Sequence, residues 1–285
     1  MILRHARGEL PLVPCVVMGI VNRTPDSFYD GGRMGLDESV RFAERLVEEG
    51  AQILDLGAVK AGPGEDVSEE EETRRLLPLV EAIAARTDVA LSVESARASV
   101  ARRAVEAGAA IVNDVTGLAD EGLAAACAAT GAALVVMHHG GQIRGRPRNP
   151  RYEDVVRDVI ETCEALARRA EEAGVKRDAI VVDPGLDFGK TTYHSLEIMR
   201  RLDEIVAAGR PVLVAPSRKD VVGETLGLPL EERLEGTLAL VALSAAAGAA
   251  IIRVHDVRAA ARVVTMVEAV AGRVLPEAPI RGLWE

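Results

Sequence analysis

Eight short apolar runs, rich in β-branched residues, recur along this chain of 285 residues, and each precedes a segment of helical pattern rich in Ala, Glu, Arg and Leu. Gly, Asp or Pro bounds each run, and the near absence of polar residues inside them is typical of parallel strands buried on both faces. The runs are Cys15–Asn22, Gln52–Gly57, Ala90–Ser95, Ala110–Val115, Ala133–His138, Ile180–Gly185, Pro211–Ser217 and Ile251–Asp256. This repetition constrains the fold more than any other feature of the sequence.

Eight strand–helix units of about 35 residues each predict an α/β fold, a closed (β/α)8 TIM barrel. Ser68, followed three residues later by Glu71, is a capping-box signal for one helix. Glycines are expected where helices end, at positions 50, 108, 131, 174, 209 and 248. A doubly wound open sheet is the alternative, and the lack of a GxGxxG turn after any run disfavours it. We expect a single domain over residues 1–285, with the barrel core at about 15–271.

The composition limits the classes of partner. Apolar residues make up 48% of the chain, enough for a large core, but aromatic residues make up only 2%. So few aromatic side chains argue against a stacking platform for single-stranded nucleic acid. The net charge of −10, without a run of Lys and Arg, argues against duplex binding. An acidic chain of this kind needs a local cluster of donors to bind an anion.

The three cysteines, Cys15, Cys127 and Cys163, lie far apart and form no CxxC pair. This spacing argues against a disulfide framework or a zinc site, and it fits a reducing compartment. The first seven residues carry charges where a signal peptide needs an apolar run, and no stretch of 18 apolar residues is free of charge. The sequence therefore predicts a cytoplasmic protein that does not span a membrane.

Polar residues gather where the predicted strands end. In a barrel these ends converge on one mouth, which is where barrel enzymes build their active sites. One such residue alone would as readily cap a helix, but a coincidence at eight ends favours a site. A metal site at His138 and His139 is disfavoured, because neighbouring residues of a strand point to opposite faces. The polar residues at strand ends are Asn22, Asp55, Glu94, Asn113, Asp114, His138, His139, Asp183, Ser217, Arg218, Lys219, Arg253 and His255.

Four segments together resemble one family. Residues 18–32 read MGIVNRTPDSFYDGG, residues 183–190 read DPGLDFGK, residues 217–219 read SRK and residues 253–256 read RVHD. In this order and spacing they resemble dihydropteroate synthase, of the pterin-binding barrel family, from about residue 15 to 270. The resemblance implies condensation of p-aminobenzoate with 6-hydroxymethyl-7,8-dihydropterin pyrophosphate and release of pyrophosphate.

The resemblance also implies roles for single residues. Asn113 and Asp183 match positions that bind the edge of the pterin, where each buried polar group left without a partner would cost about 1–3 kcal/mol. Glu94 stands where the family usually has Asp, and with Asp183 it would stabilise a developing cation. Lys219 matches a pterin-contacting lysine, so Glu94, Asp183 and Lys219 are the expected catalytic residues. Met137 and Phe188 match apolar positions around the ring.

The remaining expected contacts concern pyrophosphate and p-aminobenzoate. Asn22 matches a ligand of Mg²⁺, the expected cofactor, and Arg253 and His255 match a phosphate-binding pair. The first loop, residues 23–33, would form part of the p-aminobenzoate pocket. The expected substrate-binding residues are Thr24, Pro25, Asp26, Phe28, Asp55, Lys60, Asn113, Met137, Phe188, Ser217, Arg218, Arg253 and His255. The resemblance implies a homodimer. The apolar helix expected at residues 230–247 fits either a helix that a partner covers or one that is simply buried.

The second loop departs from the family pattern. The family usually has GGESTRPG there, whereas residues 57–64 read GAVKAGPG. Two hydroxyl groups and a guanidinium are therefore replaced, and Lys60 restores only one flexible charge. Four arginines at 144, 146, 148 and 151 form either a second anion clamp or a solvated loop.

Three hypotheses remain open at this stage. The chain is an active synthase, or an impaired paralogue that binds a pterin or a protein partner, or a methyltransferase acting on a reduced folate. The NxTPDSF and SRK segments resemble the synthase branch and disfavour the third.

Overall fold

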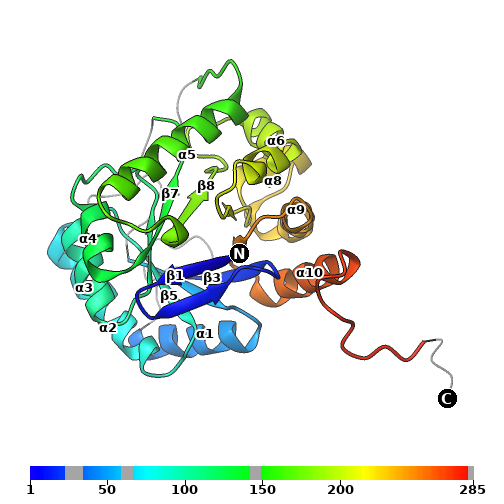
Figure 1. Ribbon diagram of the computed structural model, residues 1–285. Helices are drawn as coiled ribbons and strands as arrows, with labels where there is room; N and C mark the ends of the chain where they lie inside the picture. The colour runs from blue at the N-terminus through cyan, green and yellow to red at the C-terminus, as the bar shows by residue number, and fades with distance from the viewer. Residues whose placement is uncertain (23–34, 59–66, 142–148, 282–285) are drawn as a thin grey trace.

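The computed structural model describes residues 1–22, 35–58, 67–141 and 149–281. Parallel strands of this part form one sheet around a central axis, with helices on its outside (Figure 1). The strands are β3 (Val16–Asn22), β4 (Ile53–Gly57), β5 (Ala90–Glu94), β6 (Ile111–Asp114), β7 (Ala133–Met137), β8 (Ile180–Asp183), β9 (Leu213–Val214) and β10 (Ile251–Val254). Their order is β8-β7-β6-β5-β4-β3-β10-β9, and a parallel bridge between Val182 and Val212 closes the ring. The predicted (β/α)8 barrel is confirmed.

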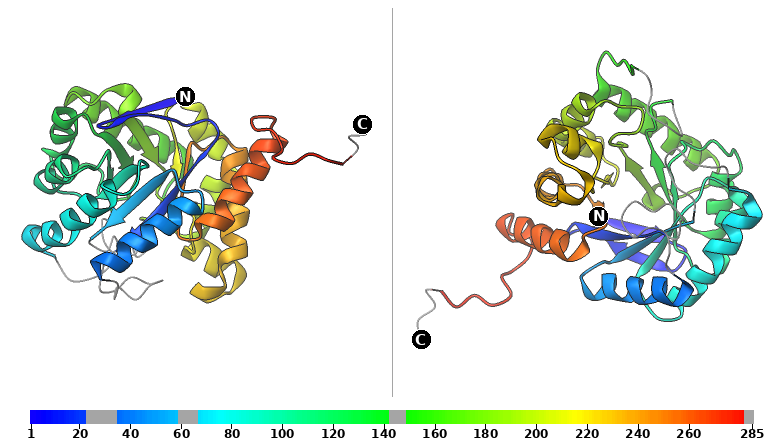
Figure 2. Two further views of the ribbon diagram at one scale, coloured as in Figure 1. Left: turned by 90° about the horizontal axis from the view of Figure 1, so that it is seen from below. Right: turned by 180° about the vertical axis from the view of Figure 1, so that it is seen from behind.

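Helices alternate with the strands and cover the outer face of the sheet (Figures 1 and 2). The Ser68 hydroxyl accepts a hydrogen bond from the Glu71 N–H, which confirms Ser68 as the helix cap. The Glu71 carboxylate accepts from Arg74 and Arg75, so only the Ser68 half of the predicted capping box is seen within residues 67–141. All six predicted glycines have positive φ, for example 72° at Gly131 after α4. The helices are α1 (Leu36–Glu48), α2 (Glu69–Ala84), α3 (Ala98–Glu106), α4 (Leu123–Thr130), α5 (Val155–Glu172), α6 (Thr192–Arg200), α7 (Leu202–Ala207), α8 (Asp220–Leu226), α9 (Leu234–Ala246) and α10 (Val257–Val270), with 3₁₀ turns η1 (Arg177–Ala179) and η2 (Leu230–Glu232).

An N-terminal hairpin, which the sequence did not reveal, lies across one end of the barrel (Figure 2). Its strands are β1 (Ile2–His5) and β2 (Gly8–Pro11), paired antiparallel. Leu3 is fully buried, and the Ala6 N–H donates to the carbonyl of Ala110, just before β6. The hairpin therefore covers the end where the strands begin and leaves the end where they finish to a site.

Two predicted elements are shorter than expected. The seventh run was predicted as a strand over residues 211–217, but β9 spans only Leu213–Val214. Pro211 and Pro216 supply no N–H group to a ladder, which limits the strand at both ends. The apolar helix predicted over residues 230–247 begins as the 3₁₀ turn η2, and α9 starts only at Leu234.

The apolar runs make the core. Met18, Ile53, Leu54, Leu91 and Val135 are each at most 1% exposed, so the barrel strands are covered from both sides. In the described part of the chain, none of the helices has both the length and the apolar character that crossing a membrane requires.

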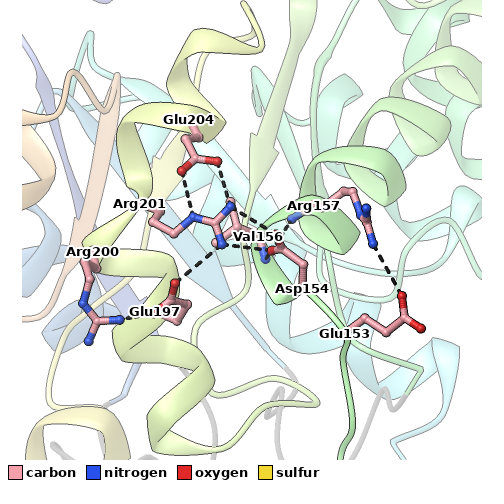
Figure 3. A network of polar contacts seen from close by, with 8 residues as sticks. All are labelled: Glu153, Asp154, Val156, Arg157, Glu197, Arg200, Arg201 and Glu204. Atoms are coloured by element: carbon pink, nitrogen blue, oxygen red, sulfur yellow. Dashed lines mark hydrogen bonds and ion pairs between the residues drawn. The ribbon is translucent and has the colours of Figure 1, made fainter.

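A polar network joins the start of α5 to the junction of α6 and α7 (Figure 3). Asp154 caps α5 by accepting hydrogen bonds from the N–H groups of Val156 and Arg157. Arg201 donates to both oxygens of Asp154, at 3.1 and 3.2 Å, and also to Glu204. The Arg201 side chain lowers the pKa of the Asp154 carboxyl. One carboxylate thus joins two neighbouring units of the barrel.

We expect Asp154→Ala to lower the midpoint of thermal unfolding by a few degrees, because it removes a helix cap and an inter-helix ion pair together. Glu153→Ala is the matched control, since Glu153 is 94% exposed and contacts Arg157 only by a long ion pair of 3.6 Å. Calorimetry of both variants measures the difference. Equal midpoints for the two variants would show that the link between α5 and the α6–α7 junction contributes nothing.

Candidate functional site

An arginine stands at the centre of the barrel mouth. Arg253, on β10, donates from Nε to Asp55 Oδ2 at 2.6 Å and from Nη2 to Glu94 Oε2 at 3.0 Å. Asp55 lies on β4 and is fully buried, while the Glu94 and Arg253 side chains are 9% and 17% exposed. Charges removed from water in this way must be paired, so the three side chains hold β10 against β4 and β5 at their carboxyl ends.

Asp55 extends this cluster to a further strand. Its Oδ1 accepts from the Ser92 hydroxyl at 2.5 Å, and its Oδ2 also accepts from Asn113 Nδ2 at 3.1 Å. Ser92 is on β5 and Asn113 on β6. Asn113 is only 3% exposed, and the bond to Asp55 fixes the orientation of its carboxamide.

We call the polar side chains at the barrel mouth the cup. Asp55, Glu94, Asn113 and Arg253 form one side of it, and residues that follow β8 and β9 form the other. Asp183, the last residue of β8, accepts from the Gly185 N–H at 2.7 Å. Lys219 donates to the Leu186 carbonyl at 2.7 Å, and its Nζ lies 5.0 Å from the centre of the Phe188 ring. Met137 is buried on β7, in register with Asp183. An apolar surface and a cation thus border the carboxylate.

Burial perturbs the charged groups of the cup. It raises the pKa of Glu94 to about 7, although Arg253 opposes the shift. Burial also raises the pKa of Asp183, against the effect of Lys219, and lowers the pKa of Lys219. For Arg253, burial acts to lower the pKa, but Asp55 and Glu94 raise it. The cup therefore contains a carboxyl group, Glu94, that changes charge close to neutral pH.

Ser217 and Arg218 follow β9 and contact protein groups. The Ser217 hydroxyl lies 2.9 Å from His255 Nδ1 and accepts from the His255 N–H. Arg218 forms a two-pronged pair with Asp256 and donates to the carbonyls of Leu230 and Glu231. This buried guanidinium joins the α8 region to the end of β10, so its contact with a substrate stays a prediction without geometric support.

A second hydrogen-bonded cluster, centred on Lys190, lies behind the loop after β8. It was not predicted from the sequence. Lys190 Nζ donates to the carbonyls of His138, Gly185 and Phe188 at 2.9–3.0 Å, and it lies 2.7 Å from His138 Nδ1. The Nε2 atom of His138 lies 2.7 Å from Asp158. The only signal in the sequence was the lysine that ends the DPGLDFGK segment. Lys190 fixes the loop that carries Phe188.

Gly185 allows this loop to pass close to β7. Its φ is 64°, and a Cβ atom there would come within 2.2 Å of the His138 carbonyl oxygen. A larger residue would push away the His138 backbone, whose carbonyl Lys190 binds. Gly185 and Lys190 therefore both hold this loop close to β7.

Asn22, the predicted magnesium ligand, ends β3 beside Gly57 of β4. A Cβ atom at position 57 would approach the Asn22 carboxamide oxygen to 2.7 Å. Glycine at this position therefore leaves room for that oxygen at the barrel mouth. One amide oxygen fits a Mg²⁺ ion that takes its other ligands from phosphate and water. Within the described residues, no three His, Cys, Asp or Glu side chains are grouped as a metal-binding set.

Several predicted site residues lie outside the described residues. They are Thr24, Pro25, Asp26, Phe28 and Lys60, as well as the arginines at 144, 146 and 148. Of the residues that are described, Asp55, Glu94, Asn113 and Arg253 are joined by hydrogen bonds, and Asp183 faces Lys219 and Arg253 closely enough to share charge effects.

Comparison with known proteins gives a consistent result. The family model described as pterin binding enzyme matches residues 18–255. The chain is 50% identical over 275 residues to inactive dihydropteroate synthase 2 of Mycobacterium leprae, covering 94% of each protein. It is 41% identical over 261 residues to the dihydropteroate synthase of Bacillus subtilis, covering 90% of this chain and 89% of the relative. The crystal structure of the Yersinia pestis dihydropteroate synthase in a sulfonamide drug complex matches with a TM-score of 0.91 and 38% identity, over 95% of this chain and 99% of that one.

The Lys190 cluster predicts a specific acid sensitivity. Burial, followed by the charge of Lys190, lowers the pKa of His138 from 6.5 to about 4. The unfolded chain therefore binds this proton at a higher pH than the folded chain does. The contribution of His138 to the free energy of unfolding is fully present above pH 6.5. It falls by about 3 kcal/mol as the pH drops through 4.

Urea unfolding at pH 7 and at pH 4.5 measures this loss, with His138→Gln as the reference. The variant should be less stable at pH 7 and should lose less stability on acidification than the wild type. Parallel losses in the two proteins would exclude His138 as the source.

Proposed function

Because this chain belongs to the family of pterin-binding enzymes, we propose that it is a dihydropteroate synthase-like transferase whose barrel mouth binds a dihydropterin diphosphate and p-aminobenzoate. The observation that carries the proposal is the meeting of Asn113, Asp183, Lys219 and Arg253 in one cup. A flat polar ring needs donors and acceptors of this kind along its edge. The resemblance found in the sequence agrees with this assignment.

In this proposal the ring lies between the two walls of the cup. Asn113 and Asp183 face its polar edge, and Phe188 with Met137 supplies apolar contact. Lys219 lies over the Phe188 ring at 5.0 Å and donates to an acceptor of the pterin in place of, or beside, the Leu186 carbonyl. Since the groups are already held by bonds to other strands, little ordering is needed when the ring binds.

The transfer reaction would follow from the charges around the ring. The bond from the methylene carbon to the diphosphate oxygen breaks, and its electron pair leaves with the diphosphate. The amine nitrogen of p-aminobenzoate then forms a bond to the same carbon and loses a proton to water. Glu94 and Asp183 stabilise positive charge on the methylene group, and Arg253 with His255 holds the diphosphate.

Asn22 would contribute the protein oxygen of a Mg²⁺ site. When bound, this ion neutralises charge on the diphosphate. The fit of the Asn22 carboxamide beside Gly57 supports this assignment.

Reduced transfer activity is a second candidate function, favoured by a specific observation. Residues 57–64 lack the hydroxyl groups and the guanidinium of the usual second loop. Each lost charge-assisted bond that forms in the transition state costs about 2–4 kcal/mol, or about 10²–10³ in rate. The Mycobacterium leprae relative is named as inactive. A protein of this kind binds the pterin and transfers it slowly.

A homodimer in the cytoplasm is the expected state of the protein. Leu243 on α9 is 57% exposed, and Met266 and Val270 on α10 are 64% and 78% exposed. Because α9 and α10 pack side by side, these side chains offer an apolar surface that a second copy would cover.

Pterin binding is tested with Asp183→Ala. Calorimetry with 6-hydroxymethylpterin should detect binding to the wild type and a loss of at least about tenfold in the variant, because ring N–H groups would lose a buried acceptor. Asp178→Ala is the control, since Asp178 lies near the start of β8 and pairs with Arg4. Unchanged affinity in Asp183→Ala would remove this carboxylate from the site.

The rate of transfer is tested by following pyrophosphate release with and without p-aminobenzoate. We expect release that depends on p-aminobenzoate and is about 10²–10³ slower than in the Bacillus subtilis enzyme. The double variant Ala61→Thr, Gly62→Arg should raise it. Full turnover in the wild type would contradict the impaired form, and a slow double variant would show that the second loop is not the cause.

A further inference from the structure

One edge of the guanidinium that would hold the diphosphate is already bound to carboxylates. An arginine binds a phosphate through two N–H groups on one edge of its guanidinium. In Arg253 the edge formed by Nε and Nη2 points at Asp55 Oδ2 and Glu94 Oε2. Any anion that approaches Arg253 therefore meets a guanidinium whose charge is compensated by two buried carboxylates.

The net charge of the cup also opposes the binding of an anion. Among the described residues it contains three carboxyl groups, Asp55, Glu94 and Asp183, against the two cations Lys219 and Arg253. Lys219 is also bound to a carbonyl. A neutral pterin alcohol adds no charge to this cup, whereas its diphosphate ester adds several negative charges. Because the groups are buried, solvent and salt screen the repulsion only weakly.

We propose that Glu94 sets the ligand preference of the mouth by holding Arg253, so that an uncharged pterin binds at least as well as its diphosphate ester. The proposal rests on the proposed function, because it assumes that the pterin occupies the cup. It identifies Glu94 as a specificity-determining residue that competes with the diphosphate for one guanidinium.

Of the two carboxylates that bind Arg253, Glu94 is the one that can be changed without altering the bonds between Asp55 and its neighbours. Asp55 is fixed by Ser92 and Asn113 as well as by Arg253, so its position belongs to the barrel itself. Glu94 reaches Arg253 at 3.0 Å from the end of β5. An aspartate there would be shorter by about 1.5 Å, one C–C bond, and its carboxylate would fall outside hydrogen-bond distance of Nη2.

The titration of Glu94 adds a second, independent readout. The groups that face it are Arg253 on β10, Asp55 on β4, Glu72 on α2 and Lys219 after β9. Burial and the two carboxylates outweigh the two cations, and the pKa of Glu94 rises to about 7. Below this pH the protonated side chain no longer competes for Arg253, so affinity for the diphosphate ester should increase as the pH falls.

The experiment compares two ligands, 6-hydroxymethylpterin and its diphosphate ester, by calorimetry on the full chain at pH 8 and pH 6. In the wild type at pH 8 the diphosphate should bind no more tightly than the alcohol. In Glu94→Asp and Glu94→Gln the ratio of the two affinities should shift toward the diphosphate by about tenfold. The ratio should depend on pH less in Glu94→Gln than in the wild type, which separates Glu94 from the titration of the ligand.

A control variant distinguishes direct competition from a general negative field. Glu72 is one of the charges that face Glu94, but it bonds to Ser95 and Arg97. Glu72→Gln should therefore leave the affinity ratio nearly unchanged. A shift as large as that of Glu94→Gln would overturn direct competition for Arg253.

The outcomes separate this inference from the proposed function. If the alcohol binds and the ratio stays constant in both Glu94 variants, Glu94 does not set the preference, while pterin binding stands. If neither ligand binds the wild type or any variant, both the proposed function and this inference fail. Should Glu94→Asp not fold, Glu94→Gln and the pH dependence of the wild type decide the question.

Discussion

The barrel mouth depends on one partly buried guanidinium, that of Arg253, held between two carboxylates from other strands. Arg253 on β10 pairs with Asp55 on β4 and with Glu94 on β5, so these three strands are fixed to one another at their carboxyl ends. Asp55 also accepts a hydrogen bond from Asn113, which ties β6 to the same cluster. The same atoms that would bind a ligand therefore also hold the barrel in register, and the site and the fold are not separable at this end.

The sequence predicted the barrel well because its signals are local. Buried strands read as apolar runs, and the glycines that end helices need a positive φ whatever surrounds them. The N-terminal hairpin escaped because its four-residue strands, with Arg4 and Glu9 among them, show no run of this kind. The seventh strand was overestimated because the apolar run continues to Pro216, whereas the hydrogen bonds of the ladder do not.

The candidate site was predicted less completely, since a strand-end position does not reveal what a polar side chain contacts. Asp114 lies beside Asn113 yet binds the turn at Thr116 and Leu118. His138 finds Asp158, twenty residues along the chain, and Lys190 binds three carbonyls. Arg218 pairs with Asp256. These residues shape the mouth from behind, and only the three-dimensional partners distinguish them from Asp55, Glu94 and Asp183.

Under the proposed function, this arrangement would let pterin binding and transfer activity separate in one chain. The cup residues are tied to several strands, so replacing one of them costs folding stability as well as binding. Among the described residues, the hydrogen bonds of this cluster join side chains of β4, β5, β6 and β10, so a substitution within residues 59–64 replaces none of these side chains. The sequence of the second loop could therefore change while the proposed ring pocket keeps its polar groups, and a protein altered in this way would lose stabilisation of the transition state before it loses recognition of the ring.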